Sequence, residues 1–195
     1  MKSLNVGCGT DVKKGFVNLD RINLSGVDVV HDLNKFPWPF EDDEFDYIYC
    51  DQVLEHLEDI PRALRELWRI SKNGAKIHIA VPHYASPGAW FDLTHKHPFG
   101  WMSLDYMAAN EIHRHSVGRM HSHEYGDKEK FNILKRKFIF GRFHRLIGVG
   151  LFSHSFPIAY EMFNLAYMFP PRHMEFDIET VKNDKKTDKK DKKEN

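Results

Sequence analysis

The sequence is poor in cysteine and has no long uninterrupted apolar run. Cys8 and Cys50 are the two cysteines among 195 residues, too few for a disulfide framework, and this fits a reducing compartment. The most apolar stretch, residues 146–169, is broken by polar residues and a proline, which makes it a poor membrane span. Residues 1–3 run straight into an apolar segment without signal-peptide architecture. We therefore expect a cytoplasmic protein with no transmembrane segment.

The chain also lacks a surplus of charge of either sign. Its 28 basic and 28 acidic side chains cancel, so there is no general attraction to a polyanion. Residues 182–195 are rich in lysine, but acidic residues alternate with the lysines and no apolar residue anchors the segment. We expect a disordered, solvated tail there and no nucleic-acid partner.

Short apolar runs, each followed by a turn, recur through the first half of the chain. They are rich in Val, Ile and Leu and cover residues 4–6, 16–19, 27–30, 45–50 and 75–81. Short, continuously apolar strands are typical of a parallel sheet with both faces covered. The sequence therefore predicts an α/β protein.

Helical spacing is clearest between the last two of these runs. Ile60, Leu64 and Leu67 predict a helix with one apolar face, capped by Asp59 and ending at Gly74. The second half is less regular. There we predict helices over residues 101–112 and 158–168, an exposed loop over residues 116–126, and strands over residues 131–140 and 174–181.

A Gly-x-Gly turn follows the first apolar run. Asn5 and Val6 lead into Gly7, Cys8 and Gly9. Such a turn lets the backbone bend sharply and approach a ligand closely. Gly-x-Gly turns also occur in ordinary loops, so the motif alone does not separate a binding site from a simple turn.

Acidic residues follow the next two predicted strands. Asp20 ends the second strand, where a carboxylate can accept both hydroxyl protons of a ribose. Asp32 and Leu33 follow the third strand, where a side chain can accept from an adenine amino group. Each aspartate could instead cap a turn. Three such features at successive strand ends favour a nucleoside site.

The same region lacks the groups that bind phosphates. A dinucleotide fingerprint needs a third glycine, and Val12 stands at that position. Only residues 10–15 separate Gly9 from the second strand, so no helix N-terminus is available for a pyrophosphate. The site suits a nucleoside without phosphates, and S-adenosylmethionine is the commonest cofactor of that kind.

Residues 4–82 carry an ordered series of motifs that resembles the class I S-adenosylmethionine-dependent methyltransferases, especially the methyltransferase type 11 group. The resemblance is carried by Asn-Val-Gly-Cys-Gly at residues 5–9, Val-Asn-Leu-Asp at 17–20, Pro-Trp-Pro-Phe-Glu-Asp-Asp-Glu-Phe-Asp at 37–46, Val-Leu-Glu-His-Leu at 53–57, Leu-Arg-Glu-Leu-Trp-Arg-Ile at 64–70 and Ile-Ala-Val-Pro at 79–82. It continues weakly through residues 92–99.

The resemblance implies a Rossmann-like, mostly parallel sheet with helices on both faces. One antiparallel strand near the C-terminus and a shortened first β–α connection complete the predicted fold. Residues 1–181 would form a single methyltransferase domain. Within it, residues 83–126 would form an insertion or lid on the substrate side.

The resemblance also implies roles for particular residues. Gly7 and Gly9 would cradle the methionine part of the cofactor, with Asn5 and Cys8 of the same motif also at the cofactor site, and Asp20 would hold the ribose. Asp32 and Leu33 would contact the adenine. Cys50, Asp51 and Gln52, at the end of the fourth strand, would line the site near the sulfonium. Asn5 replaces the usual acidic residue of the first motif, so the polar support of that turn is altered.

Candidate catalytic residues follow the fifth strand. Methyl transfer to oxygen or nitrogen can need a base, and histidine titrates near neutral pH. His95, then His83, are the preferred candidates, with Asp92 beside them on the loop. His83 could instead bond a backbone carbonyl, and His95 and Asp92 could only brace their loop. We interpret His56 as structural.

Two further groups of residues can be interpreted as either structural or functional. The pairs His113 with His115 and His121 with His123 could bind a metal, but no cysteine accompanies them and we predict none. The aromatic residues between Phe152 and Phe169 favour core packing. The sharper alternative is an apolar wall or membrane-facing edge for an apolar acceptor.

The leading functional hypothesis is an enzyme that methylates a small-molecule or apolar acceptor. One alternative is a non-catalytic module that binds S-adenosylmethionine. A nicotinamide-dependent oxidoreductase is the other alternative, disfavoured by the missing third glycine.

Overall fold

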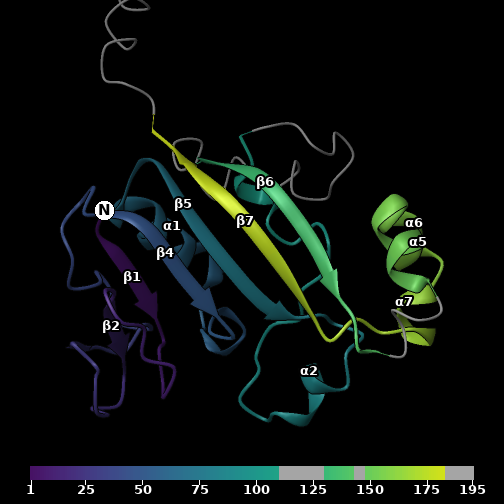
Figure 1. The fold of residues 1–195 in the computed structure, drawn as a ribbon, viewed down its shortest axis with the longest axis horizontal. Coiled ribbons are helices and arrows are strands. Elements are labelled where there is room, and N and C mark those ends of the chain that lie inside the picture. The colour runs from purple at the N-terminus through teal and green to yellow at the C-terminus, as the bar shows by residue number, and fades with distance from the viewer. Residues whose placement is uncertain (110–129, 143–147, 183–195) are drawn as a thin grey trace, which may run out of the picture.

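The computed structural model describes residues 1–109, 130–142 and 148–182, in which seven strands form one sheet (Figure 1). The strand order is β3-β2-β1-β4-β5-β7-β6. The strands are β1 (Ser3–Val6), β2 (Val17–Asp20), β3 (Val29–Val30), β4 (Phe45–Asp51), β5 (Ser71–Pro82), β6 (Lys130–Ile139) and β7 (His173–Val181). The five strands expected in the first half are all present, and so are the two expected near the C-terminus.

Strand direction confirms the predicted fold class. The neighbours from β3 to β5 are all parallel, whereas β7 runs antiparallel to both β5 and β6. The register places Asn5 beside Tyr49 and Tyr49 beside His78 across three strands. Because the parallel strands end at one edge, the turns after β1, β2 and β4 lie together.

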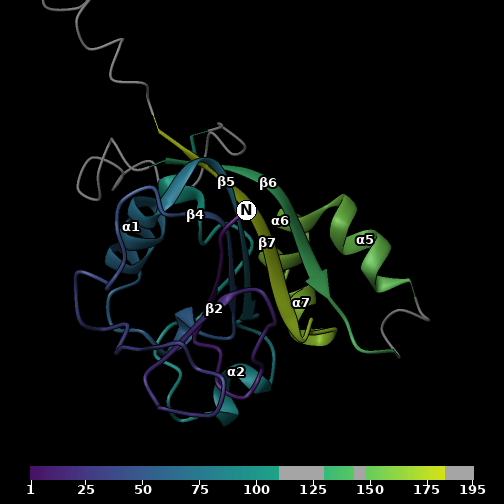
Figure 2. The same ribbon diagram turned by 60° about the vertical axis from the view of Figure 1, so that its left-hand side comes forward.

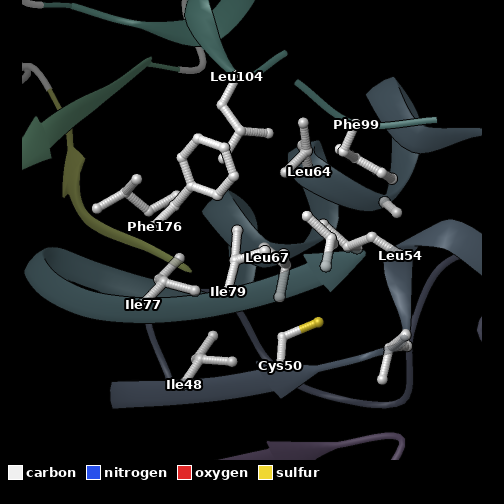
Figure 3. Close-up of a cluster of buried hydrophobic side chains, with 14 of the residues drawn as sticks. Ile48, Cys50, Leu54, Leu64, Leu67, Ile77, Ile79, Phe99, Leu104 and Phe176 are labelled. Carbon is white, nitrogen blue, oxygen red and sulfur yellow. The ribbon is translucent and has the colours of Figure 1, made fainter. Parts of the chain in front are cut away.

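The helix α1 (Ile60–Ile70) covers one face of β4 and β5 (Figure 2). It begins as predicted, because the Asp59 side chain accepts a hydrogen bond from the Arg62 N–H at 2.9 Å. It ends at Ile70, and the predicted end at Gly74 is wrong: the chain passes directly into β5, where Gly74 lies at a positive φ of 78°. Leu64 and Leu67 of α1 pack into the core with Ile48, Ile77 and Ile79 (Figure 3).

The segment that follows β6 contains three short helices where the sequence predicts a single helix over residues 158–168. These helices, α5 (Val149–Ser155), α6 (Pro157–Met162) and α7 (Leu165–Met168), follow β6 in the chain, and α5 and α6 lie beside it (Figures 1 and 2). The break falls at Asn164, whose φ of 60° cannot continue a right-handed helix. The expected helix over residues 101–112 is reduced, in its described part, to one turn, η2 (Asp105–Met107).

The aromatic residues of this segment are not all core residues. Tyr160 is fully buried against Phe138 and Phe140, but Phe156 and Phe163 are mostly exposed. The expectation that this aromatic stripe packs into the core is therefore wrong for most of its members. The segment is divided into three short helices, with breaks at Phe156 and Asn164, so its aromatic residues do not form one continuous helical face. None of the described helices has the length and apolar character needed to cross a membrane.

Candidate functional site

A cavity of about 440 Å³ opens at the carboxyl ends of β1, β2 and β4. That volume lies within the range of small-molecule sites. The residues that line the cavity are Gly7, Asp20, Arg21, His31, Asp32, Leu33, Asn34, Gln52, Val53, His56, Leu57, Leu93, Thr94 and Lys96. Five of the residues singled out from the sequence are among them: Gly7, Asp20, Asp32, Leu33 and Gln52.

The Gly7–Gly9 turn forms one wall of the site. Gly7 has φ 62°, and a Cβ built on it would lie 2.5 Å from Cγ2 of Val53, so glycine is required by both backbone and packing. Gly9 has φ 49°, and its missing Cβ would point into open space. The Gly9 N–H donates to Oδ2 of Asp20 at 2.8 Å. The first turn and the end of the second strand are therefore in direct contact.

A loop over residues 7–16 connects β1 to β2, and it is held by two buried amides in place of a helix. The Asn5 amide donates to the Asp11 carbonyl at 2.8 Å and to Oδ1 of Asn18 at 3.0 Å. Oδ1 of Asn18 also accepts from the Lys13 N–H at 2.9 Å. Asn5 thus supports the glycine turn from beneath and is not part of the cavity lining. Sequence reasoning missed Asn18.

The other end of the cavity is formed after β3. Oδ1 of Asp32 accepts from the Asn34 N–H at 3.0 Å, which fixes the start of this turn. Leu33 is held by the buried indole of Trp38, whose N–H donates to the Leu33 carbonyl at 3.1 Å. Asp32 and Leu33 therefore lie at the cavity on a backbone that is fixed from the core side.

The side chains of Cys50, Asp51 and Gln52, at the end of β4, lie in three different environments. Side chains alternate across a strand, and Cys50 points into the core toward α1 (Figure 3). Asp51 points to the opposite face, where its Oδ2 accepts from the Tyr49 hydroxyl at 2.8 Å. Gln52 lies just past the strand with φ 54° and lines the cavity. Cys50 and Asp51 are not among the residues that line the cavity.

Cys8 lies inside the glycine turn and is almost fully buried. Burial, reinforced by the nearby Asp20 carboxylate, raises the pKa of its thiol. The Cys8 side chain is absent from the cavity lining, so its contribution to the turn comes from its backbone.

His83 has a structural environment. Its side chain is fully buried and bonds Oε1 of Glu161 through Nε2 at 3.0 Å, while Nδ1 accepts from the Ala85 N–H at 3.1 Å. It does not line the cavity. Because both ring nitrogens are bonded inside the fold, we do not carry His83 forward as a candidate base.

Asp92 and His95 lie close together beside the cavity. Oδ1 of Asp92 accepts from the hydroxyl and the N–H of Thr94, and these bonds lower the pKa of the carboxyl. His95 bonds the Ala89 carbonyl through Nδ1 at 3.1 Å, and its Nε2 lies 3.8 Å from Oδ2 of Asp92. The expected grouping of these two residues is present, with Thr94 rather than His95 as the closest partner of the carboxylate.

His56, interpreted from the sequence as structural, lies at the cavity. It lines the cavity, and its ring contacts that of His95 edge to face with centroids 4.7 Å apart. The preceding Glu55 is fully buried, and burial raises the pKa of its carboxyl to about 7. The two residues belong to η1 (Leu54–His56), a tight turn that sends Leu54 into the core and His56 to the cavity. The sequence offers no signal for this position at the cavity, because His56 stands within the Val-Leu-Glu-His-Leu motif at residues 53–57 and is interpreted there as structural.

The comparisons with known proteins agree with this geometry. Residues 4–79 match a family model described as a methyltransferase domain. A search of curated proteins finds no match. Among solved structures, a methyltransferase of Archaeoglobus fulgidus that depends on S-adenosylmethionine superposes with a TM-score of 0.58 at 17% identity, over 91% of this chain and 85% of that one.

Two other solved methyltransferases that depend on S-adenosylmethionine share the fold. The protein from Mesorhizobium loti has a TM-score of 0.52 at 15% identity and covers 91% of this chain and 90% of its own. The protein from Thermotoga maritima has a TM-score of 0.53 at 14% identity, over 93% of this chain and 82% of its own.

The fold is shared with solved S-adenosylmethionine-dependent methyltransferases over most of the chain, and the cavity lies at the carboxyl ends of its parallel strands. The resemblance to class I S-adenosylmethionine-dependent methyltransferases is confirmed, in sequence over residues 4–79 and in fold over most of the chain.

Proposed function

We propose that this protein is an enzyme that binds S-adenosylmethionine in the strand-end cavity and methylates a small acceptor. The observation that carries the proposal is the bond between Gly9 and Asp20, which joins a glycine turn to a carboxylate with no helix N-terminus between them. Such a site offers carboxylate oxygens that can accept from ribose hydroxyls and a backbone that a ligand can approach closely, but no helix N-terminus to bind a phosphate. A phosphate-free nucleoside fits these groups.

The residues around the cavity fit the parts of this cofactor. Open space beside Gly9 and the bend at Gly7 would hold the methionine end. Asp20 would accept from the ribose hydroxyls, and Asp32 with Leu33 would contact the adenine. Gln52 and Val53 would border the region between them.

The bound cofactor supplies a methyl group on a cationic sulfur, which is already activated for displacement. The protein's own residues then need to hold the acceptor in line and exclude water. Positioning of this kind can contribute roughly 7–11 kcal/mol in favourable cases. His56 and Thr94 line the cavity beside the exposed Leu93, so this side offers polar groups next to an apolar surface. We assign it to the acceptor.

The test is turnover of the cofactor. Purified protein is incubated with S-adenosylmethionine and a panel of small hydroxyl, amine and carboxylate acceptors, some with apolar tails, and S-adenosylhomocysteine is measured by mass spectrometry. We expect product with at least one acceptor class, and at least tenfold less of it from the Asp20→Ala variant at a cofactor concentration below saturation. Binding of the cofactor without turnover would favour the non-catalytic module, and binding of a nicotinamide dinucleotide instead would favour the oxidoreductase.

A further inference from the structure

Three potential metal ligands converge beside the cavity. Glu55, His56 and His95 each offer a ligand atom, and these atoms all lie within 4.8 Å of one another. Glu55 and His56 are adjacent on η1, and His95 comes from the loop before β6. A backbone bond from the Lys96 N–H to the Glu55 carbonyl at 2.7 Å ties that loop to η1. The cluster is therefore held by the fold and does not depend on side-chain contacts alone.

The Glu55 carboxyl is the least explained member of this cluster. It is fully buried, and within the described part of the chain neither of its oxygens has a hydrogen-bond partner. A buried polar group without a partner is costly, and most such groups in native proteins have one. The nearby Lys96 ammonium pairs with Glu58 at 3.1 Å instead. A cation between Glu55 and the two histidines would give the Glu55 carboxylate the partner that no described protein group provides.

Hydrogen bonds at Nδ1 hold both imidazoles in the tautomer that leaves Nε2 unprotonated. Nδ1 of His95 faces the Ala89 carbonyl and must therefore carry the proton there. The Thr94 hydroxyl donates to Asp92, which leaves its oxygen to accept from Nδ1–H of His56 at 2.8 Å. Both rings then present the lone pair of Nε2. Outer contacts that fix the tautomer in this way are typical of histidines that bind metals.

We propose that Glu55, His56 and His95 bind a divalent transition-metal ion at the acceptor side of the cavity. Two imidazoles and one carboxylate suit zinc, cobalt, manganese or iron better than magnesium or calcium. Three protein ligands leave at least one position open, as in catalytic rather than structural sites. Because His56 lines the cavity, an acceptor oxygen could occupy that position. This last role rests on the proposed function, whereas metal binding itself does not.

The experiment measures metal binding directly on the full chain after treatment with a chelator. Cobalt(II) is titrated and its visible absorption recorded, and zinc binding is measured by calorimetry. We expect one site, and at least tenfold weaker binding in Glu55→Gln and in His95→Gln. Glu55→Gln keeps the side-chain volume, and circular dichroism with a thermal melt confirms that each variant is folded.

Matched controls separate this site from other histidines. His78 is also partly buried, and its Nδ1 bonds the Asp177 carboxylate at 2.8 Å. It lies outside the proposed cluster, so His78→Gln should bind metal as the wild type does. A variant with alanine at His113, His115, His121 and His123 should also retain the site. Unchanged binding in both Glu55→Gln and His95→Gln, or loss only in the four-histidine variant, would overturn the proposal.

The same variants distinguish this proposal from the proposed function. Glu55→Gln and His95→Gln should still bind S-adenosylmethionine within about threefold of the wild type, since neither residue lines the cavity. Loss of metal with retained cofactor binding supports the metal site. Cofactor binding that fails in the wild type, with cobalt still bound, would contradict the proposed function alone.

Discussion

The backbone N–H of Gly9 donates to Oδ2 of Asp20 at 2.8 Å, so the turn after β1 and the carboxylate that ends β2 form one unit. The other oxygen of Asp20 accepts from the Ile22 N–H at 2.9 Å. The carboxylate is thereby fixed at the cavity wall with lone pairs left over, because an ionised carboxylate has about four acceptor positions. In the proposed function, these remaining positions would accept from the ribose hydroxyls of a nucleoside without a phosphate-binding helix.

The two glycines of the turn should respond differently to alanine. Gly7→Ala should lower the free energy of unfolding by about 1–3 kcal/mol, because the backbone is left-handed and the new Cβ would meet Val53. Gly9 is also left-handed, so alanine is strained there too, but the new Cβ of Gly9→Ala meets open space, and the change should cost less stability while weakening cofactor binding more. Urea unfolding and calorimetry on both variants test this. Equal losses of unfolding free energy in the two variants would contradict the conclusion that contact with Val53 makes Gly7 the more sensitive position.

The paired amides beneath the turn should be important for stability. Asn18→Ala removes three bonds to the loop that replaces a helix and leaves the buried Asn5 amide short of a partner. We expect a loss of about 1–3 kcal/mol in unfolding free energy, with weaker cofactor binding. Asn132→Ala, which loses a 3.3 Å bond to Glu179 near the sheet edge, is the control and should stay within about 0.5 kcal/mol. Comparable losses would count against a special role for the Asn5–Asn18 pair.

The two thiols should be protected in the folded protein. Burial raises the pKa of both, so less thiolate is present at pH 8 than in an unfolded chain. Labelling with a thiol reagent should be slow for Cys8 and slower still for Cys50, which lies in the core. S-adenosylmethionine should slow Cys8 further, because it would cover the turn. Rapid native labelling of Cys50, followed by mass spectrometry, would contradict its placement.

The segment from α5 to α7 offers a matched pair of aromatic substitutions. Tyr160 is fully buried and its hydroxyl donates to the Phe169 carbonyl, whereas Phe163 is 75% exposed. Tyr160→Ala should therefore cost about 3–5 kcal/mol of unfolding free energy. Phe163→Ser should change it by less than about 0.5 kcal/mol. Thermal or urea unfolding of the two variants tests whether this short-helix segment presents its apolar residues to solvent.

The sequence predicts the sheet well because its strands are short, apolar and followed by turns with strong local preferences. The ends of β1, β2 and β3 are visible as Gly7, Asp20 and Asp32, since each residue type marks a turn. The helix start at Asp59 is equally local. The end of α1 is not local, because Gly74 suits a helix end but α1 ends four residues earlier, at Ile70, and β5 begins at Ser71.

The rest of the site depends on contacts that are distant in sequence. Cys50 and Asp51 stand beside Gln52 in the chain, but strand alternation directs them to opposite faces, away from the cavity. His56 meets His95 only because a backbone bond joins η1 to a loop about forty residues later. The predicted helix over residues 158–168 is divided at one left-handed residue, Asn164, which periodicity alone does not reveal.

Calorimetric titration of the full chain with S-adenosylmethionine tests the central claim most directly. We predict one site per chain in the wild type, at least tenfold weaker binding in Asp20→Ala, and little change in His78→Gln. An absence of binding in the wild type, or equal affinity in Asp20→Ala, would contradict the claim that the Gly9–Asp20 unit recognises the nucleoside.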